Sequence, residues 1–358
     1  MRFRSQSTGP VGVDITGRTV RLLQVRHRSA GVEIAGGAMR DVAVSEMGDD
    51  NALRTCLGEL VAAHKFSGRT AVTCLPTADV SIKSIRLPDM PEAELQSAAD
   101  FEARERFAAM GDDCVIRAIP VGRVGSDSEP QQEVIVYAVR PEVIDARLDI
   151  ISSAGFDVAA LEPAPDAFFR PFERFLQRAS DADSPNALIE VDDRGSQIVL
   201  TRGSEIVFVK DCEVGGALFD QAVADSMNMS LNQAAELRRK QWHRGDGDDI
   251  SREVRDATAP LIQKLARELN LSLRYSSVTF RGHRPQVVVC GGRDASVMLA
   301  GQLGEELEMT VEPADPFRGV DGAEVLSGDT RRTDAPGWTR VLGLALKTPA
   351  RPGARKVA

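Results

Sequence analysis

Aromatic residues, paired cysteines and long apolar runs are all scarce in this chain of 358 residues. With two Trp and two Tyr, it offers no aromatic platform on which nucleic-acid bases could stack. Its five cysteines show no Cys-x-x-Cys spacing, which favours separate buried thiols in a reducing compartment. No stretch approaches 18 apolar residues, and the first ten residues lack the apolar core of a signal peptide. We therefore expect a cytoplasmic protein without direct membrane insertion.

Positively charged residues are fewer than negatively charged ones, 44 against 53. The formal net charge is −9, whereas a nucleic-acid-binding protein normally presents a basic face, so we expect no nucleic-acid partner. The composition, 42% hydrophobic and 27% charged, is that of an ordinary globular protein, and the length allows two domains.

A predicted β-hairpin near the N-terminus, VGVDITGRTVRLLQV (11–25), carries an acidic residue at the end of its first strand. The strand ends in Asp14, and the polar turn that follows contains Thr16, Gly17 and Arg18. Backbone N–H groups of such a turn can face a phosphate, while the carboxylate holds Mg²⁺ through its waters. In a single hairpin the same residues are more often only turn chemistry.

The same pattern returns in the second half of the chain, in ALIEVDDRGSQIVLTRGSEIVFV (187–209). Its first strand ends near Glu190, the polar turn leads to Gly195 and Ser196, and each hairpin is followed by a further turn and a third strand. Two copies of this arrangement indicate an internal duplication of a whole domain. We expect the two acidic hairpins to face each other across a nucleotide cleft.

Two Gly-Gly pairs lie at expected junctions of strand and helix. Gly215 and Gly216 precede a predicted helix over 217–226, whose unpaired N-terminal donors could bind an anion. Gly291 and Gly292 follow the apolar strand QVVVC, where backbone could approach a flat ligand. For Gly291 and Gly292, the alternative is that they only make a tight turn between strand and helix.

Several motifs together resemble a known family. They are VGVDITGRTVRLLQV, SIKSIRLPDMPEAELQSAADFEAR, RPEVIDARLDIISSAGFDVAALEPAPDAF, ALIEVDDRGSQIVL, FVKDCEVGGALFDQAVADSMNMSLNQAAELRRK, and VVVCGGRDAS with VEPADPFRGV. In this order they resemble the PilM family, actin-like proteins of type IV pilus assembly that are related to FtsA, over roughly residues 10–347.

The resemblance implies an α/β fold: an actin-like (ASKHA/ribonuclease H-like) two-domain fold with an FtsA/PilM-type inserted subdomain. The expected parts are an N-terminal tail (1–9), domain 1 (10–186) with an insert at about 80–155, domain 2 (187–347) with a subdomain at about 217–280, and a basic tail (348–358).

The resemblance also implies ATP and Mg²⁺ as cofactors. The implied nucleotide-binding residues are Asp14, Thr16, Gly17, Arg18, Arg21, Glu190, Gly195, Ser196, Gly215, Gly216, Glu236, Arg239, Gly291 and Gly292. Asp14 and Glu190 would hold the metal through water. Two departures from the family pattern, Thr16 in place of Gly and Glu190-Val191-Asp192 in place of Asp-Ile-Gly, predict a degenerate site with slow or absent hydrolysis. No catalytic residue is therefore assigned.

The function implied by the resemblance is that of a non-enzymatic scaffold, peripheral at the inner membrane through its partners. PilM-like proteins bind the N-terminal cytoplasmic segment of a PilN-like membrane protein, here around 81–104 and 133–150, and meet other pilus assembly components. The alternatives are a small-molecule kinase of the same superfold, and an FtsA-like or GspL-like component of another envelope machine.

Overall fold

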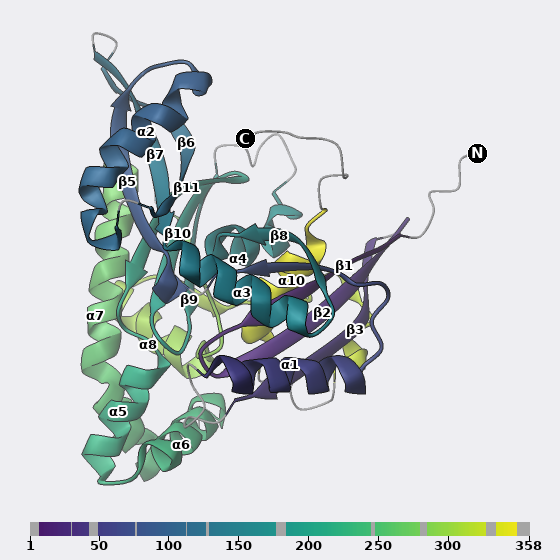
Figure 1. Cartoon of the computed structure of the whole chain (residues 1–358). Coiled ribbons are helices and arrows are strands. Elements are labelled where there is room, and N and C mark those ends of the chain that lie inside the picture. The colour runs from purple at the N-terminus through teal and green to yellow at the C-terminus, as the bar shows by residue number, and fades with distance from the viewer. Residues whose placement is uncertain are drawn as a thin grey trace. The chain divides into compact units, whose positions relative to one another are not determined.

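The computed structural model (Figure 1) describes residues 7–29, 31–42, 49–75, 77–111, 113–126, 129–176, 184–244, 248–279, 285–326 and 334–348. The chain forms two compact units, which are described separately. Unit 1 consists of Met1–Leu75, Asp145–Pro171 and Pro316–Ala358, and unit 2 of Pro76–Ile144 and Phe172–Asp315.

Unit 1 is built on a six-stranded sheet with the order β14-β3-β2-β1-β4-β8. Its strands are β1 (Ser7–Ile15), β2 (Thr19–Arg28), β3 (Gly31–Asp41), β4 (Thr70–Cys74), β8 (Asp157–Glu162) and β14 (Val320–Asp321). The first three strands run antiparallel, and β4, β8 and β14 join in parallel. Asp14 lies opposite Arg21 in the predicted hairpin.

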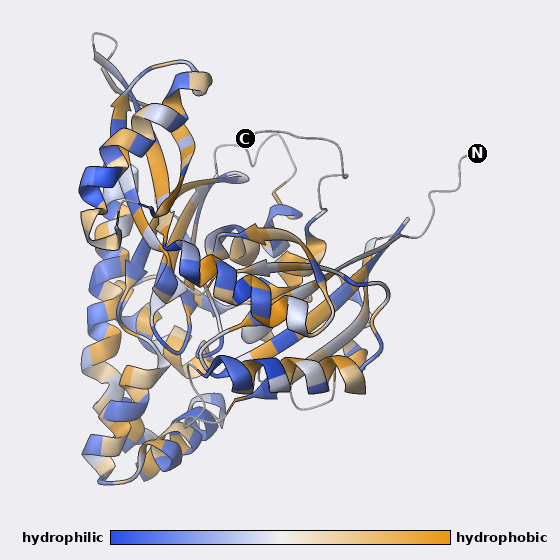
Figure 2. Cartoon of the chain, viewed as in Figure 1, coloured by the Kyte–Doolittle hydropathy of each residue, from blue (hydrophilic) through white to orange (hydrophobic). Residues whose placement is uncertain are grey.

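Helices cover both faces of this sheet. They are α1 (Asp50–Ala63), α3 (Pro141–Ser153), α4 (Ala164–Glu173) and α10 (Thr339–Leu346). Successive residues of a strand point to opposite faces, so Leu22 packs in the cluster of α1 and α3, while Leu23 packs in the cluster of α10. Asp49 accepts a hydrogen bond from the Asn51 N–H and caps α1. The turns of α1 show both hydrophilic and hydrophobic residues (Figure 2).

Unit 2 contains a five-stranded sheet with the order β11-β10-β9-β12-β13. The strands are β9 (Pro185–Val191), β10 (Ser196–Arg202), β11 (Glu205–Cys212), β12 (Val287–Gly291) and β13 (Thr310–Pro313). Its helices are α5 (Gly216–Met227), α6 (Leu231–Arg244), α7 (Asp249–Thr279) and α8 (Val297–Leu307). Ser230 hydroxyl accepts from the Gln233 N–H at the start of α6.

The two sheets share one topology. In each, an antiparallel three-stranded meander is followed by two parallel strands on the side of its first strand, as in β3-β2-β1-β4-β8 and β11-β10-β9-β12-β13. The duplication inferred from the two acidic hairpins is therefore present in the strand order. The predicted domain boundaries remain predictions.

A second, smaller sheet in unit 2 comes from the sequence predicted as an insert. It has the order β5-β7-β6, with β5 (Ser81–Pro88), β6 (Val115–Ser126) and β7 (Glu129–Val139), and α2 (Glu92–Arg106) packs on one face. The buried Glu133 of β7 accepts hydrogen bonds from Arg86 Nε at 2.9 Å and from the Tyr275 hydroxyl of α7 at 2.5 Å. This polar clamp ties the small sheet to the long helix.

No helix in the described part of the chain combines the length and the apolar character needed to cross a membrane.

Candidate functional site

The turn of the first hairpin closes on itself. The backbone N–H and the hydroxyl of Thr16 both donate to the carbonyl of Thr19, at 2.9 and 3.2 Å. The Thr19 hydroxyl in turn donates to Asp41 Oδ1 at 2.7 Å. The Thr16 donors, expected to serve a phosphate, are thus used inside unit 1. Gly17 and Arg18 complete the turn between β1 and β2.

Asp14, the predicted metal anchor of unit 1, is paired with a cation of the protein itself. Arg340 Nε of α10 donates to Asp14 Oδ1 at 3.0 Å, and both side chains are buried. The Cys74 thiol also points at this oxygen, at 4.0 Å. The neighbouring guanidinium weakens the attraction of the Asp14 carboxylate for a hydrated Mg²⁺ ion, because its positive charge opposes that of the metal.

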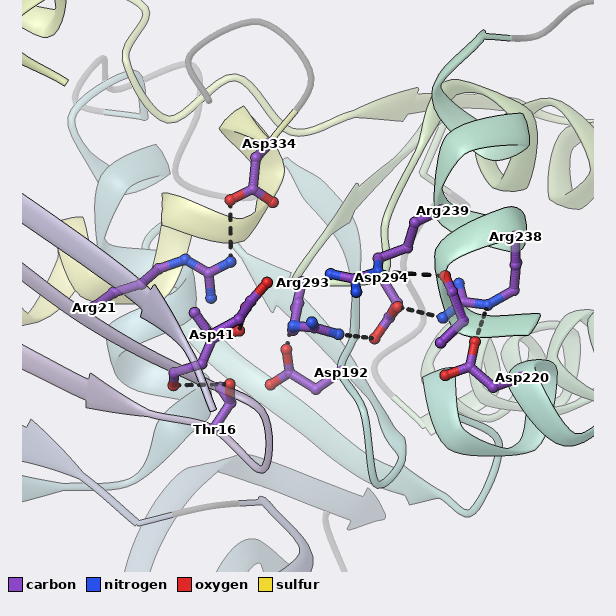
Figure 3. A network of polar contacts seen from close by, with 12 residues as sticks. Thr16, Arg21, Asp41, Asp192, Asp220, Arg238, Arg239, Arg293, Asp294 and Asp334 are labelled. Atoms are coloured by element: carbon purple, nitrogen blue, oxygen red, sulfur yellow. Dashed lines mark hydrogen bonds and ion pairs between the residues drawn. The ribbon is translucent and has the colours of Figure 1, made fainter. Parts of the chain in front are cut away.

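Arg21, which the resemblance implies as a nucleotide-binding residue, is also engaged within unit 1. Its Nη2 donates to Asp334 Oδ2 at 3.1 Å, and its side chain is buried (Figure 3). A Cβ at Gly337 would lie 2.7 Å from Arg21 Nη2, so a side chain there would displace this guanidinium.

In unit 2 the predicted residues of the second hairpin lie on β9, at the start of β10 and in the turn between these strands. Glu190 is buried on β9 opposite Gln197, and the Ser196 hydroxyl donates to the Val214 carbonyl at 2.5 Å. The Asp192 N–H donates to the Gly195 carbonyl at 3.0 Å and closes the turn.

The first amides of α5 make hydrogen bonds within unit 2. Gly215 is its N-cap and Gly216 its first residue, as the sequence indicated. However, the Gly216 and Ala217 N–H groups donate to the carbonyls of Asp192 and Asp193, both at 2.9 Å. These first two amides therefore serve the β9–β10 turn and are not open to an anion, because a backbone N–H makes one strong hydrogen bond.

The turn after β12 packs against the same hairpin. Gly292 has a φ of +96°, and a Cβ there would lie 2.5 Å from the Val191 carbonyl oxygen, so only glycine fits. The Asp294 N–H donates to that carbonyl at 2.9 Å, and the Arg293 N–H to Asp192 Oδ1 at 3.1 Å. Gly291 ends β12 just before this turn. The alternative reading of these glycines, as makers of tight turns, is thus supported by their contacts.

Three buried ionic residues, absent from the predicted site, join the helices to this turn. Arg238 of α6 donates from Nε to Asp220 Oδ1 at 2.6 Å and from Nη2 to Asp294 Oδ1 at 2.7 Å (Figure 3). Its guanidinium carbon lies 4.6 Å from the Trp242 ring centroid and 5.9 Å from that of Phe219. The sequence signal for Arg238 was helical spacing: Ala234, Ala235 and Trp242, three or four positions away, are apolar.

The two predicted ribose- or base-contacting residues differ in their surroundings. Glu236 is exposed on α6, whereas Arg239 is partly buried and donates from Nε to the Ala235 carbonyl at 3.4 Å. Burial alone would raise the pKa of the Asp294 carboxyl, but the charges of Arg238, Arg293 and Arg239 outweigh it and hold that pKa below its ordinary value. Asp294 is therefore a fixed anion.

Within each unit, groups that the resemblance implies for a Mg²⁺–nucleotide are engaged by the protein itself. The carboxylate of Asp14 is paired with Arg340, and two amides at the start of α5 are already bonded. A third group, the Asp294 carboxylate, lies over Gly216, where a Cβ would meet its Oδ2 at 2.3 Å.

Comparison with known proteins places the fold and the family. No curated protein matches the sequence. The structure is similar to that of a "PilM-PilN type IV pilus biogenesis complex", with a TM-score of 0.78 and 24% identity over 94% of this chain and 98% of that one. It is also similar to the ethanolamine utilization protein EutJ from Carboxydothermus hydrogenoformans, with a TM-score of 0.56 and 16% identity over 95% and 89%.

These matches and the duplicated strand order identify the actin-like fold. A sequence model of the family described as type IV pilus assembly protein PilM matches residues 12–349, nearly the whole chain. The chain belongs to the PilM family of type IV pilus assembly proteins.

Proposed function

We propose that this chain is a scaffold of type IV pilus assembly that binds the N-terminal cytoplasmic segment of a PilN-like inner-membrane protein. The observation that carries the proposal is the family match over residues 12–349, supported by the similarity to a PilM-PilN complex along 94% of the chain. In this role the protein is cytoplasmic, lies at the inner membrane through its partner, and meets further pilus components.

The small sheet of unit 2 and its helix supply the surface for this partner. On α2, the side chain of Phe101 is 82% exposed, and Ile119 of β6 is also exposed. An aromatic side chain left in water is a typical anchor for a peptide, because its burial on binding releases the water around the ring. Arg104 pairs with Asp100 and Arg106 with Glu102 at i, i+4 spacing along the same helix.

A peptide-binding measurement tests this function. A labelled synthetic peptide with the first residues of the membrane protein encoded beside this gene is titrated with the full chain, and fluorescence anisotropy is followed. We expect saturable binding, weakened about tenfold or more by Phe101→Ala. Leu271→Ala removes another exposed side chain, 55% exposed on α7, and should leave the affinity unchanged. Absence of binding by the wild-type chain would refute the proposed partner.

We infer that the protein acts by binding and not by catalysis. In support, the hairpin residues expected to serve a phosphate and a metal make contacts within their own unit, among them Asp14 with Arg340 and Thr16 with Thr19. ATP and Mg²⁺, together with the predicted nucleotide-binding residues, stay predictions. Phosphorylation of a metabolite by the pure protein would favour a kinase of the same superfold instead.

A further inference from the structure

We propose that Asp294 is a built-in anion that takes the place of a bound phosphate in unit 2, so that this half of the actin-like fold is held together without nucleotide. The proposal goes beyond the scaffold function, since it concerns whether that scaffold responds to a ligand.

The position of the Asp294 carboxylate is the first support. It lies against Gly216, the first residue of α5: a Cβ built there would meet Oδ2 at 2.3 Å, Cγ at 2.6 Å and Oδ1 at 2.9 Å. The N-terminus of a helix is the end at which its dipole favours negative charge. A carboxylate in contact with the Cα of the first helical residue therefore lies where the field of the helix favours an anion, although the first two amides of α5 are bonded elsewhere.

The surrounding cations are the second support. Oδ1 accepts from Arg238 Nη2 at 2.7 Å, and Oδ2 lies 3.7 Å from Arg293 Nη1. Guanidinium groups are the protein's usual partners for both carboxylates and phosphates. Asp220 Oδ1 accepts a hydrogen bond from Arg238 Nε at 2.6 Å. This second contact fixes the guanidinium in the orientation in which Nη2 reaches Asp294.

The packing around the carboxylate is the third support. The Asp294 backbone N–H bonds the Val191 carbonyl, and the Gly216 N–H bonds the Asp192 carbonyl, each at 2.9 Å. One anion thus lies where the turn after β12, the β9–β10 turn and the start of α5 meet. In a nucleotide-dependent protein of this fold class, the ligand's phosphates could make that connection; here a side chain of the chain makes it.

The wild-type chain gives the first arm of the test. Mg-ATP and, separately, inorganic phosphate are titrated into the full-length protein by calorimetry, and the thermal midpoint is measured at the same concentrations. We expect no saturable heat and no rise in midpoint beyond that given by sodium chloride at equal ionic strength. Saturable micromolar binding of Mg-ATP would overturn the proposal.

Removal of the anion gives the second arm. Asp294→Ala removes the carboxylate, so we expect a lower thermal midpoint. Inorganic phosphate should partly restore the midpoint, and its apparent affinity for the variant should be at least about tenfold higher than for the wild type. Asp220→Ala is the matched control, because it also deprives Arg238 of a carboxylate but leaves the anion at α5 in place. It should lose stability without rescue by phosphate.

Equal behaviour of the two variants toward phosphate would contradict the proposal, as would an Asp294→Ala protein as stable as the wild type. If Asp294→Ala does not fold, Asp294→Asn keeps the shape and removes only the charge. A midpoint unchanged in Asp294→Asn would then contradict the role of the negative charge, and the wild-type titration with Mg-ATP still decides the question of ligand binding.

Discussion

Arg340 donates a hydrogen bond to Asp14 inside unit 1, with 3.0 Å between Nε and Oδ1 and with both side chains almost fully removed from solvent. A buried carboxylate and a buried guanidinium each depend on the other, because an isolated charge in the protein interior is strongly disfavoured. The residue singled out as a metal anchor is thus also part of the internal structure of its unit.

Arg340→Gln should therefore destabilise the protein by about 3–5 kcal/mol, since it leaves the Asp14 carboxylate without its cation. The double variant Asp14→Asn/Arg340→Gln should lose much less than the sum of the two single losses, because it leaves no unpaired charge. Urea unfolding of the four proteins in this cycle measures the coupling. Additive losses would mean that the two side chains do not act as a pair.

The contact between α4 and α10 leads to a second prediction. A Cβ at Gly343 would lie 1.7 Å from the carbonyl oxygen of Ala167, so the two helices touch backbone to backbone at this point. Gly343→Ala should lower stability by about 1–3 kcal/mol or more, because one of the helices must move. Gly58→Ala in α1 is the control: nothing lies within 4 Å of its Cβ, and we expect a gain of about 0.4–1 kcal/mol. Thermal unfolding of both variants checks the contrast.

The clamp between β7 and α7 gives a third prediction. Tyr275→Phe removes the hydroxyl that donates to Glu133 at 2.5 Å, and should cost about 1.5–3 kcal/mol, the usual worth of a hydrogen bond to a charged group. Hydrogen exchange should show faster exchange of the β5 and β7 amides. Ser277→Ala, whose hydroxyl bonds only the Leu273 carbonyl within α7, should leave that exchange unchanged. Equal effects of the two substitutions would argue against a clamp.

A fourth prediction concerns pH. Burial, and next the charge of Glu162, raise the pKa of Asp166 to about 6, although Arg170 and Lys347 oppose the shift. An unfolded Asp has a pKa of about 3.9, so the folded protein keeps this proton up to a higher pH than the unfolded chain does. The stability contributed by protonated Asp166 is complete below about pH 4 and is lost as the pH rises through about 6, at roughly 1.4 kcal/mol for each pKa unit.

Asp166→Asn should remove this pH dependence and leave the protein more stable than the wild type at pH 7. Urea unfolding between pH 4 and 8 measures it, with Asp225→Asn on the exposed side of α5 as control. A wild-type stability that does not fall between pH 4 and 7 relative to Asp166→Asn would contradict the raised pKa.

The architecture could be predicted from the sequence because it depends on repeated local patterns. Each acidic hairpin is a continuous stretch in which strand, turn and strand follow directly from alternation and turn residues, and the two copies then share a strand order. The glycines at 215, 216 and 292 were also placed correctly at element ends, because glycine marks such positions by its backbone freedom.

The partners of the site residues could not be predicted in this way. Arg340 is 326 residues from Asp14. Arg238 bonds one acid in α5, Asp220, and one in the turn after β12, Asp294, so these pairs form only through tertiary packing. One signal was available: Arg340 stands alone in the apolar segment GWTRVLGLAL, and a charge at a buried helix position demands a partner of opposite charge. The sequence does not say which one.

The division of the chain between the two units has a consequence for synthesis. Unit 2 is complete once residue 315 has been made, whereas unit 1 needs Pro316–Ala358, whose Trp338 and α10 pack against one face of its sheet. Although unit 1 contains the first strand, the Leu23 side of its sheet lacks Trp338 and α10 until that part of the chain has been made. We therefore expect the second-encoded unit to finish folding first, and the N-terminal sheet to be the part of the nascent chain that most needs a chaperone.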